Sequence, residues 1–206
     1  MLTAFQKKEI LSFVEKKVSA VFRAHNVRAH DLAHTKRVRN WSVKIARAEK
    51  ADIFLCELVA WLHDIGRTKE KSILIGQTHH ELSYQMCRHW FKKEPLFRLL
   101  TKRQKLEILY AVRYHWNDAA DKYQIAWILR DADKLDTLGE VGVKRSVQYA
   151  HGNADWLKAD LRFKYQTYYW LHAKTARKIV KDKKLMEPVD KFLVSFLKKG
   201  IKPVAL

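Results

Sequence analysis

Hydrophobic residues recur along the chain at intervals of three and four, with charged residues between them. The clearest run has the positions i, i+3, i+4 and i+7 and consists of Leu55, Leu58, Val59 and Leu62. This spacing is typical of a helix with one buried face. We therefore predict a buried helix that ends at His63 and Asp64, with Gly66 suited to a left-handed residue that closes it.

The same periodicity predicts further helices over residues 4–24, 34–48, 79–90, 102–115 and 123–138 and in the C-terminal third. Asp31 is a helix-start residue, and Thr78 followed by Glu81 has the form of a capping box. Pro95 marks a break. Residues 139–155, with three glycines, are predicted to be the most loop-like stretch. The fold class expected is all-α, a helical bundle in a single domain.

The composition agrees with a helical fold and indicates the protein's compartment and the charge of its partners. The chain has 206 residues, 48% of them hydrophobic, with six Gly and three Pro, which favours one globular, helix-rich domain. It contains no run of about 18 apolar residues, so no membrane span is expected. The N-terminus lacks a signal-peptide core, and Cys56 and Cys87 are expected to be reduced core residues of a cytoplasmic protein. The net charge of +19 favours polyanionic partners such as nucleotides, nucleic acid or acidic lipid surfaces.

Polar residues that can bind metals extend the buried stripes of five predicted helices. These inward-facing residues are His34, His63, Asp64, His79, His115 and either Asp133 or Asp136. Burying a carboxylate in an apolar setting costs free energy unless it is paired or binds a cation. Six inward-facing His and Asp residues are hard to explain by separate hydrogen bonds. Nitrogen and carboxylate ligands suit Mn, Fe, Zn, Ni or Co, and also Mg. A structural zinc site is disfavoured because cysteine is absent from the set.

Periodicity leaves some assignments open. It favours His79 over His80 as the inward residue of its helix and does not choose between Asp133 and Asp136. His30 and Asp31 form a second His-Asp pair, which we expect to lie outside the site because it precedes the periodic part of its helix.

The order His, His-Asp, His, His, Asp resembles the HD-domain metal-dependent phosphohydrolase superfamily, and more closely its small, uncharacterised bacterial branch. The resemblance runs from about residue 23 to 196. Residues 34–38 resemble the family's H-x-x-R-V, residues 62–65 its namesake motif, residues 79–83 its H-x-x-x-S segment and residues 131–136 its D-A-D-[RK]-L-D. The resemblance implies an HD-type bundle with a core at about 23–140 and a helical extension at about 154–200 packed on it.

By the same resemblance, a metal between the helices is held by His34, His63, Asp64 and Asp133. His79 and His115 match positions that bind a second metal in dinuclear members or contact substrate in mononuclear ones. One divalent ion is favoured over two, because Trp116 stands where several dinuclear members have a second histidine.

The expected activity is hydrolysis of a phosphate ester of a nucleotide or similar small phosphorylated metabolite by a metal-activated water. Catalytic roles are predicted for Asp64, for Arg67 on phosphate oxygens, and for His79 or His115 as the acid for the leaving oxygen. Further candidates to hold phosphate are Arg37, Lys69 and Lys134. The alternatives are a dinuclear phosphodiesterase, such as a dinucleoside polyphosphate or cyclic nucleotide hydrolase, and a non-catalytic nucleic-acid-binding protein. The oligomeric state is left open.

Overall fold

A computed structural model of the protein describes residues 2–25, 27, 30–70 and 78–198. Within these residues every regular element is an α-helix or a short 3-10 helix, which confirms the all-α prediction. None of the helices described there combines the length and apolarity needed to cross a bilayer. Lys71, Lys199 and Lys202, which belong to the charged stretches of the sequence, lie outside the described residues.

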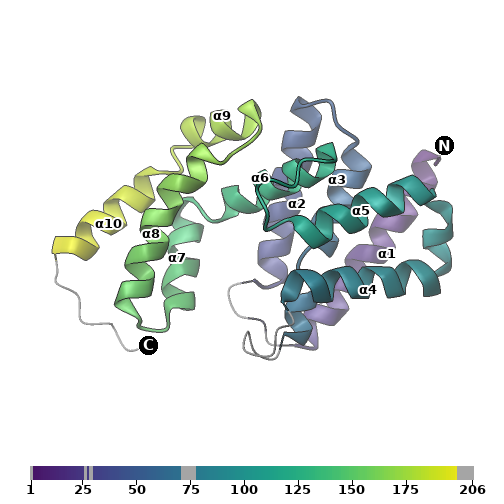
Figure 1. Cartoon of the computed structure of the whole chain (residues 1–206), viewed down its shortest axis with the longest axis horizontal. Helices are drawn as coiled ribbons and strands as arrows, with labels where there is room; N and C mark the ends of the chain where they lie inside the picture. Colours follow the sequence, from purple (N-terminus) through teal and green to yellow (C-terminus); the bar gives the residue numbers. More distant parts are fainter. Residues whose placement is uncertain (1, 26, 28–29, 71–77, 199–206) are drawn as a thin grey trace.

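The N-terminal two thirds of the chain form a bundle around one central helix (Figure 1). Its helices are α1 (Ala4–Arg23), α2 (Leu32–Ala48), α3 (Ile53–Leu62), α4 (His79–Lys93), α5 (Lys102–Tyr114) and α6 (Gln124–Asp136), with 3-10 helices η1 (Ile65–Lys69) and η3 (Pro95–Leu99). The central helix is α3, in which Leu58, Val59 and Leu62 are fully buried. It packs against α1, α2, α5 and α6, so its C-terminal end lies inside the bundle.

Side-chain caps define where several of these helices begin. Asp31, the predicted helix start, accepts a hydrogen bond from the His34 backbone N–H at 2.8 Å and places His34 in the first turn of α2. Asp52 caps α3 in the same way, accepting from the Leu55 N–H at 3.1 Å. The first turn of α2 and the whole of α3 are therefore anchored at their N-termini.

The predicted capping box at the start of α4 is wrong, although Thr78 is its N-cap residue. The Thr78 hydroxyl instead lies 2.8 Å from His80 Nε2, and no side-chain capping hydrogen bond forms. The Glu81 carboxylate accepts from Arg113 Nε on α5 at 2.8 Å. A charged partner on the neighbouring helix has replaced the local contact.

Gly66 does not adopt the predicted left-handed conformation. Its role is a close approach between η1 and the start of α4. A Cβ at this position would lie 2.2 Å from the His79 carbonyl oxygen and 2.4 Å from the Ser83 nitrogen, and the Gly66 N–H already donates to the Ser83 hydroxyl at 2.8 Å. Because both clashing atoms are backbone, no side-chain rotation can relieve them.

Gly66→Ala should therefore push α4 away from the end of α3. We expect an unfolding free energy lower by about 1–3 kcal/mol, as for other overpacked sites, and a melting temperature lower by several degrees. Ser83→Ala, which removes only the hydroxyl acceptor, is the milder comparison. Thermal unfolding of the two variants measures the difference, and an unchanged melting temperature for Gly66→Ala would contradict the close approach.

The prediction that residues 139–155 are the most loop-like stretch is wrong, because they contain α7 (Gly139–Ala150). Gly139 has a φ of 68° and follows the turn between α6 and α7. Gly142 is helical, and a Cβ there would lie 2.0 Å from the Thr137 carbonyl oxygen. The glycines that suggested a loop thus serve a turn and a tight contact, while the buried face of the helix includes Val143, Ser146 and Ala150.

Three C-terminal helices build a second hydrophobic cluster next to the bundle (Figure 1). They are α7, α8 (Ala154–Tyr169) and α10 (Glu187–Lys198), and the buried members of the cluster are Val143, Ala150, Leu157, Leu161, Val189 and Phe196. In the chain, α9 (Lys174–Asp182) comes between α8 and α10, and it packs against the bundle. Just before it, the backbone N–H groups of His172 and Ala173 donate to the Asp131 carboxylate at 2.9 and 2.7 Å. This carboxylate ties the chain before α9 to α6.

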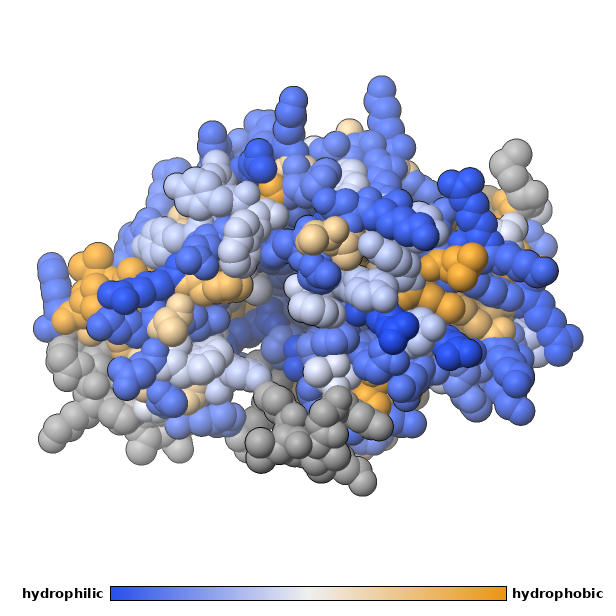
Figure 2. All heavy atoms as spheres, in the orientation of Figure 1, coloured by the Kyte–Doolittle hydropathy of each residue, from blue (hydrophilic) through white to orange (hydrophobic). Residues whose placement is uncertain are grey.

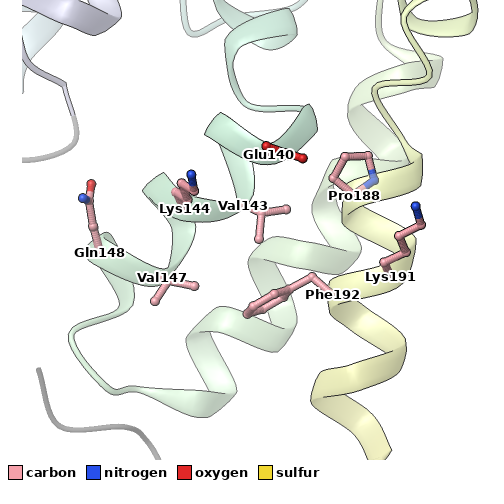
Figure 3. A pocket seen from close by; sticks show the side chains of 8 residues that line it. All are labelled: Glu140, Val143, Lys144, Val147, Gln148, Pro188, Lys191 and Phe192. Carbon is pink, nitrogen blue, oxygen red and sulfur yellow. The ribbon is translucent and has the colours of Figure 1, made fainter.

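The surface of the molecule is mostly hydrophilic, with hydrophobic side chains gathered over the end of α10 in the view of Figure 2. The exposed hydrophobic residues of α10 are Val194 and Leu197. A cavity of about 620 Å³ lies between α7 and α10. Figure 3 shows Val143, Val147 and Phe192 along it, with the amino groups of Lys144 and Lys191 at its edges.

Candidate metal centre

The structure brings the predicted histidines and aspartates together from five helices. His34 comes from the first turn of α2, and His63 and Asp64 follow the last residue of α3. His79 begins α4, and His115 is the C-cap of α5. Asp133, on α6, completes the set. Residues up to 99 positions apart in the chain therefore meet at one point beside the end of the central helix.

Two histidines face one oxygen of Asp64, and a second aspartate lies against one of these histidines. The Oδ2 atom of Asp64 lies 3.7 Å from His34 Nε2 and 3.7 Å from His63 Nε2, and Asp133 Oδ1 lies 3.4 Å from His34 Nε2. The ligand atoms of His34, His63 and Asp133 all lie within 4.8 Å of one another. We call His34, His63, Asp64 and Asp133 the first donor group.

The other oxygen of Asp64 faces two further histidines. Asp64 Oδ1 lies 3.5 Å from His79 Nε2 and 3.6 Å from His115 Nε2, and these two nitrogens are 3.3 Å apart. We call Asp64, His79 and His115 the second donor group, since their ligand atoms also lie within 4.8 Å of one another. Asp64 thus lies between two clusters of possible ligands and belongs to both.

Hydrogen bonds on the far side of the rings orient three of the imidazoles. His63 Nδ1 donates to the Ala60 carbonyl at 2.8 Å, and His115 Nδ1 donates to the Val112 carbonyl at 2.7 Å. His34 Nδ1 donates to Asp136 Oδ2 at 2.7 Å. Because carbonyl and carboxylate oxygens accept hydrogen bonds, each ring has a proton on Nδ1, and its Nε2 faces the centre.

The atoms at the centre lack the partners that buried polar atoms usually have. Among the described residues, His34 Nε2, His63 Nε2 and Asp64 Oδ1 are buried and make no hydrogen bond. Each such atom costs about 1–3 kcal/mol when left unsatisfied. Two imidazole lone pairs and a carboxylate that converge without donors fit a divalent cation of the kind that nitrogen and oxygen ligands hold.

The electrostatics of the centre favour the protonation states that ligands need. Burial alone would raise the pKa of Asp64, but His63 and then Arg67 hold it well below its usual range, so the side chain is a carboxylate. Burial lowers the pKa of His79 to about 2 and that of His115 to about 4. Both rings are neutral near pH 7, which suits metal binding and disfavours the predicted role of proton donor.

The two aspartates that periodicity could not separate lie in different places. Asp133 is in the first donor group and its side chain is 30% exposed. Asp136 is buried behind His34, where it accepts hydrogen bonds from Arg37 Nε at 2.6 Å and from Arg145 Nη1 at 2.7 Å. Burial would raise the pKa of Asp136, but the hydrogen bonds from His34 and Arg37 hold it below its usual value.

Of the four basic residues predicted to hold phosphate, Arg67 lies in the site. Its Nε is 3.6 Å from Asp64 Oδ2 and its Nη1 donates to Glu70 Oε2 at 3.0 Å. Arg37 is engaged with Asp136, and Lys134 pairs with Asp118 and donates to the Trp170 carbonyl at 3.2 Å. Lys69 is an exposed residue of η1.

Several residues beside the centre were not predicted as part of it. Glu70 accepts from the His79 backbone N–H at 3.2 Å, and Arg145 reaches the site from the segment predicted as a loop. His30 belongs to neither donor group, but its ring centroid lies 5.3 Å from that of His34. If residues 139–150 had been predicted as a helix, Arg145 could have been considered as a residue near the site.

His79, which periodicity favoured, faces the site, whereas the His80 ring stacks on Trp116 with a centroid distance of 5.3 Å. The cavity between α7 and α10 contains none of the residues of either donor group. Its volume therefore does not identify it as the site, because the convergent polar groups lie elsewhere.

Comparisons with known proteins agree with this arrangement. The HD domain family model matches residues 31–138. The uncharacterized protein YpgQ of Bacillus subtilis strain 168 is 25% identical over 172 residues, which cover 82% of each chain. The crystal structure of YpgQ in complex with ADP has a TM-score of 0.69 at 20% identity and covers 97% of this chain and 98% of its own. That of a predicted HD superfamily hydrolase from an uncultured Thermotogales bacterium has a TM-score of 0.63 at 28% identity, covering 94% and 92%.

Proposed function

Because this chain belongs to the HD domain family, we propose that it is a metal-dependent phosphohydrolase that cleaves a phosphate ester of a nucleotide or similar small phosphorylated metabolite. The observation that carries the proposal is the convergence of buried, unsatisfied ligand atoms on both sides of Asp64. The ADP in the YpgQ crystal structure supports a nucleotide as the substrate.

The first donor group would hold the principal ion. Its two imidazoles and two carboxylates suit Mn, Fe, Ni, Co or Zn, and Mg when waters complete the shell. Such an ion supplies Lewis acidity toward a phosphoryl oxygen and lowers the pKa of water. The chain's own contribution is orientation, because Ala60 and Asp136 fix the His63 and His34 rings through their Nδ1 atoms.

Arg67 is the residue that we propose binds the phosphate. Its Nε is buried and makes no hydrogen bond to the part of the chain that the structure describes, although it lies 3.6 Å from Asp64 Oδ2. Glu70 holds the other side of the guanidinium. A guanidinium that keeps free N–H groups next to a metal centre can donate to phosphate oxygens as they approach the ion.

The direct test is metal analysis of the purified protein followed by hydrolysis assays on a panel of nucleotides with each divalent ion. We expect metal to copurify and at least one nucleotide to be hydrolysed only when metal is present. His89→Ala, at an exposed position on α4, is the control and should behave as the wild type. A protein that binds no divalent ion, or whose activity survives a chelator, would contradict the proposal.

A dinuclear phosphodiesterase is the second candidate, and the second donor group favours it. This group offers three ligand atoms, from Asp64, His79 and His115. The Asp64 carboxylate also belongs to the first donor group. A second ion would therefore lie beside the first, as two-metal phosphoesterases require. Three donors should bind it more weakly than the four donors bind the principal ion.

Removing one ring of the second group tests this candidate. His115→Ala should leave the first ion in place and abolish a weaker second binding event, because His115 contributes to the second donor group alone. Titration calorimetry with Mn²⁺ measures both events, with His89→Ala as the control. If the wild type binds a single ion, or if His115→Ala still binds two, the dinuclear candidate fails.

A further inference from the structure

A small cavity lies beside the metal centre, between α7 and α8, and the proposed chemistry does not use it. Its volume is about 220 Å³. The residues of its lining that matter here are His30, Arg145, Tyr149, Trp156, Asp160 and Lys164. They combine two aromatic rings with charged groups, of which Lys164 is buried, and this is the composition of a binding pocket rather than of a packing defect.

The cavity shares a wall with the metal centre. The His30 ring centroid is 5.3 Å from that of His34 and 6.1 Å from that of Tyr149, so His30 stands between the first donor group and the cavity. Arg145, which also lines the cavity, donates to the carboxylate of Asp136 that orients His34. The cavity therefore adjoins the metal centre, with His30 at the boundary between the two.

The outer part of the cavity presents aromatic faces. The rings of Tyr149 and Trp156 have centroids 5.0 Å apart and planes inclined by 37°. Tyr149 is 40% exposed and Trp156 is partly buried, so neither ring is enclosed by the second hydrophobic cluster. Exposed aromatic rings of this kind stack on flat rings of a ligand, and nucleobases are the usual partners.

The inner part of the cavity carries an ion pair in which the lysine is buried and the aspartate is partly exposed. Lys164 is only 3% exposed, and its Nζ donates to the Thr137 carbonyl at 2.8 Å and lies 3.2 Å from Asp160 Oδ2. Among the described residues, this buried oxygen has no partner apart from its ion pair with Lys164. It can accept a hydrogen bond from an N–H group on the edge of a base.

We propose that this cavity is the subsite for the nucleobase of the substrate, with Tyr149 and Trp156 as the stacking residues and Asp160 as the acceptor for a base N–H. The inference rests on the proposed function, because it places the phosphate at the metal centre. A volume of about 220 Å³ is below the roughly 300–1,000 Å³ of cavities that enclose a whole small ligand, so it suits a ring system and not an entire nucleotide.

Ligand-observed NMR on protein stripped of metal with a chelator tests the subsite without turnover. Dissociation constants are compared for adenosine 5′-monophosphate, guanosine 5′-monophosphate and ribose 5-phosphate. Trp156→Ala should weaken binding of the two nucleotides about tenfold, as for other base-stacking residues, and leave ribose 5-phosphate unchanged. Trp156→Phe should retain most of the affinity. Phe163→Ala, at an exposed aromatic residue of the same helix, is the matched control and should change nothing.

Asp160→Asn adds a readout that a folding defect does not produce, namely a change in the ratio of the two nucleotide affinities. Equal affinity of the wild type for nucleotides and ribose 5-phosphate, or equal losses in Trp156→Ala and Phe163→Ala, would overturn the subsite. Base-dependent binding without any metal-dependent hydrolysis would defeat the proposed function and leave the subsite standing. Hydrolysis with the same kcat/KM for nucleotides and their base-free analogues would defeat the subsite alone.

Discussion

Replacing Asp64 by alanine should abolish metal binding at both donor groups and reduce metal-dependent hydrolysis by more than about 100-fold. Loss of a residue that only orients a ligand already costs about 10–100-fold in metal affinity or activity, and Asp64 is itself a predicted ligand. Its Oδ2 faces His34 and His63, and its Oδ1 faces His79 and His115. A neighbouring side chain cannot replace it, because both oxygens lie in the buried centre.

Metal content and metal-dependent thermal stability measure this effect separately from turnover. At a free metal concentration of 100 times Kd, binding adds about 2.7 kcal/mol to the unfolding free energy, or about 5–10 °C in Tm for a chain of this size. We expect this rise in the wild type and none in Asp64→Ala. Asp155→Ala, at an exposed aspartate of α8, is the control and should keep the rise. A stoichiometric ion in Asp64→Ala would contradict the shared-ligand arrangement.

The parts of the fold that the sequence predicted are those that depend on local periodicity. The stripe of Leu55, Leu58, Val59 and Leu62 corresponds to buried positions of α3. The candidate ligands could be predicted in the same way, because they continue such stripes toward the helix ends. Their convergence required the observation that five stripes each end in a polar residue. Periodicity within each helix points to the histidines and to Asp64, whereas it left Asp133 and Asp136 undecided and only the family resemblance favoured Asp133.

The parts that were missed depend on contacts between distant segments. Glycine has a low helix propensity, so Gly139 and Gly142 suggested a loop, although one serves a turn and the other a close backbone contact. The capping box at Thr78 failed because Glu81 found Arg113, a residue 32 positions away. No local pattern signals either event, since the deciding atoms belong to another element.

The contacts of the residues behind the ligands could likewise not be predicted from local sequence patterns. Arg37 was predicted to be a candidate for holding phosphate, because a guanidinium can donate hydrogen bonds to phosphate oxygens. In the structure it donates twice to Asp136, from Nε at 2.6 Å and from Nη2 at 3.1 Å. The sequence supplies the charge, but only the packing of α2 against α6 determines which anion it meets.

Asp136→Ala should therefore impair the centre although Asp136 lies in neither donor group. The substitution removes the acceptor that orients the His34 ring and the carboxylate that two guanidiniums share. We expect metal affinity to fall about 10–100-fold. The unfolding free energy should fall by about 3 kcal/mol, the lower end for breaking a buried pair, because the Arg37 side chain is 32% exposed.

Two comparison variants separate the orientation of His34 from the charge of the network. Asp136→Asn keeps an oxygen that can accept from His34 Nδ1, so it should retain more metal affinity than Asp136→Ala while losing the ion pairs. Arg37→Ala leaves His34 and Arg145 on Asp136 and should preserve metal content. Metal titration and thermal unfolding of the three variants give both quantities. If Arg37→Ala instead raises KM at least tenfold with metal content intact, Arg37 binds phosphate as the sequence predicted, and its pairing with Asp136 gives way when substrate binds.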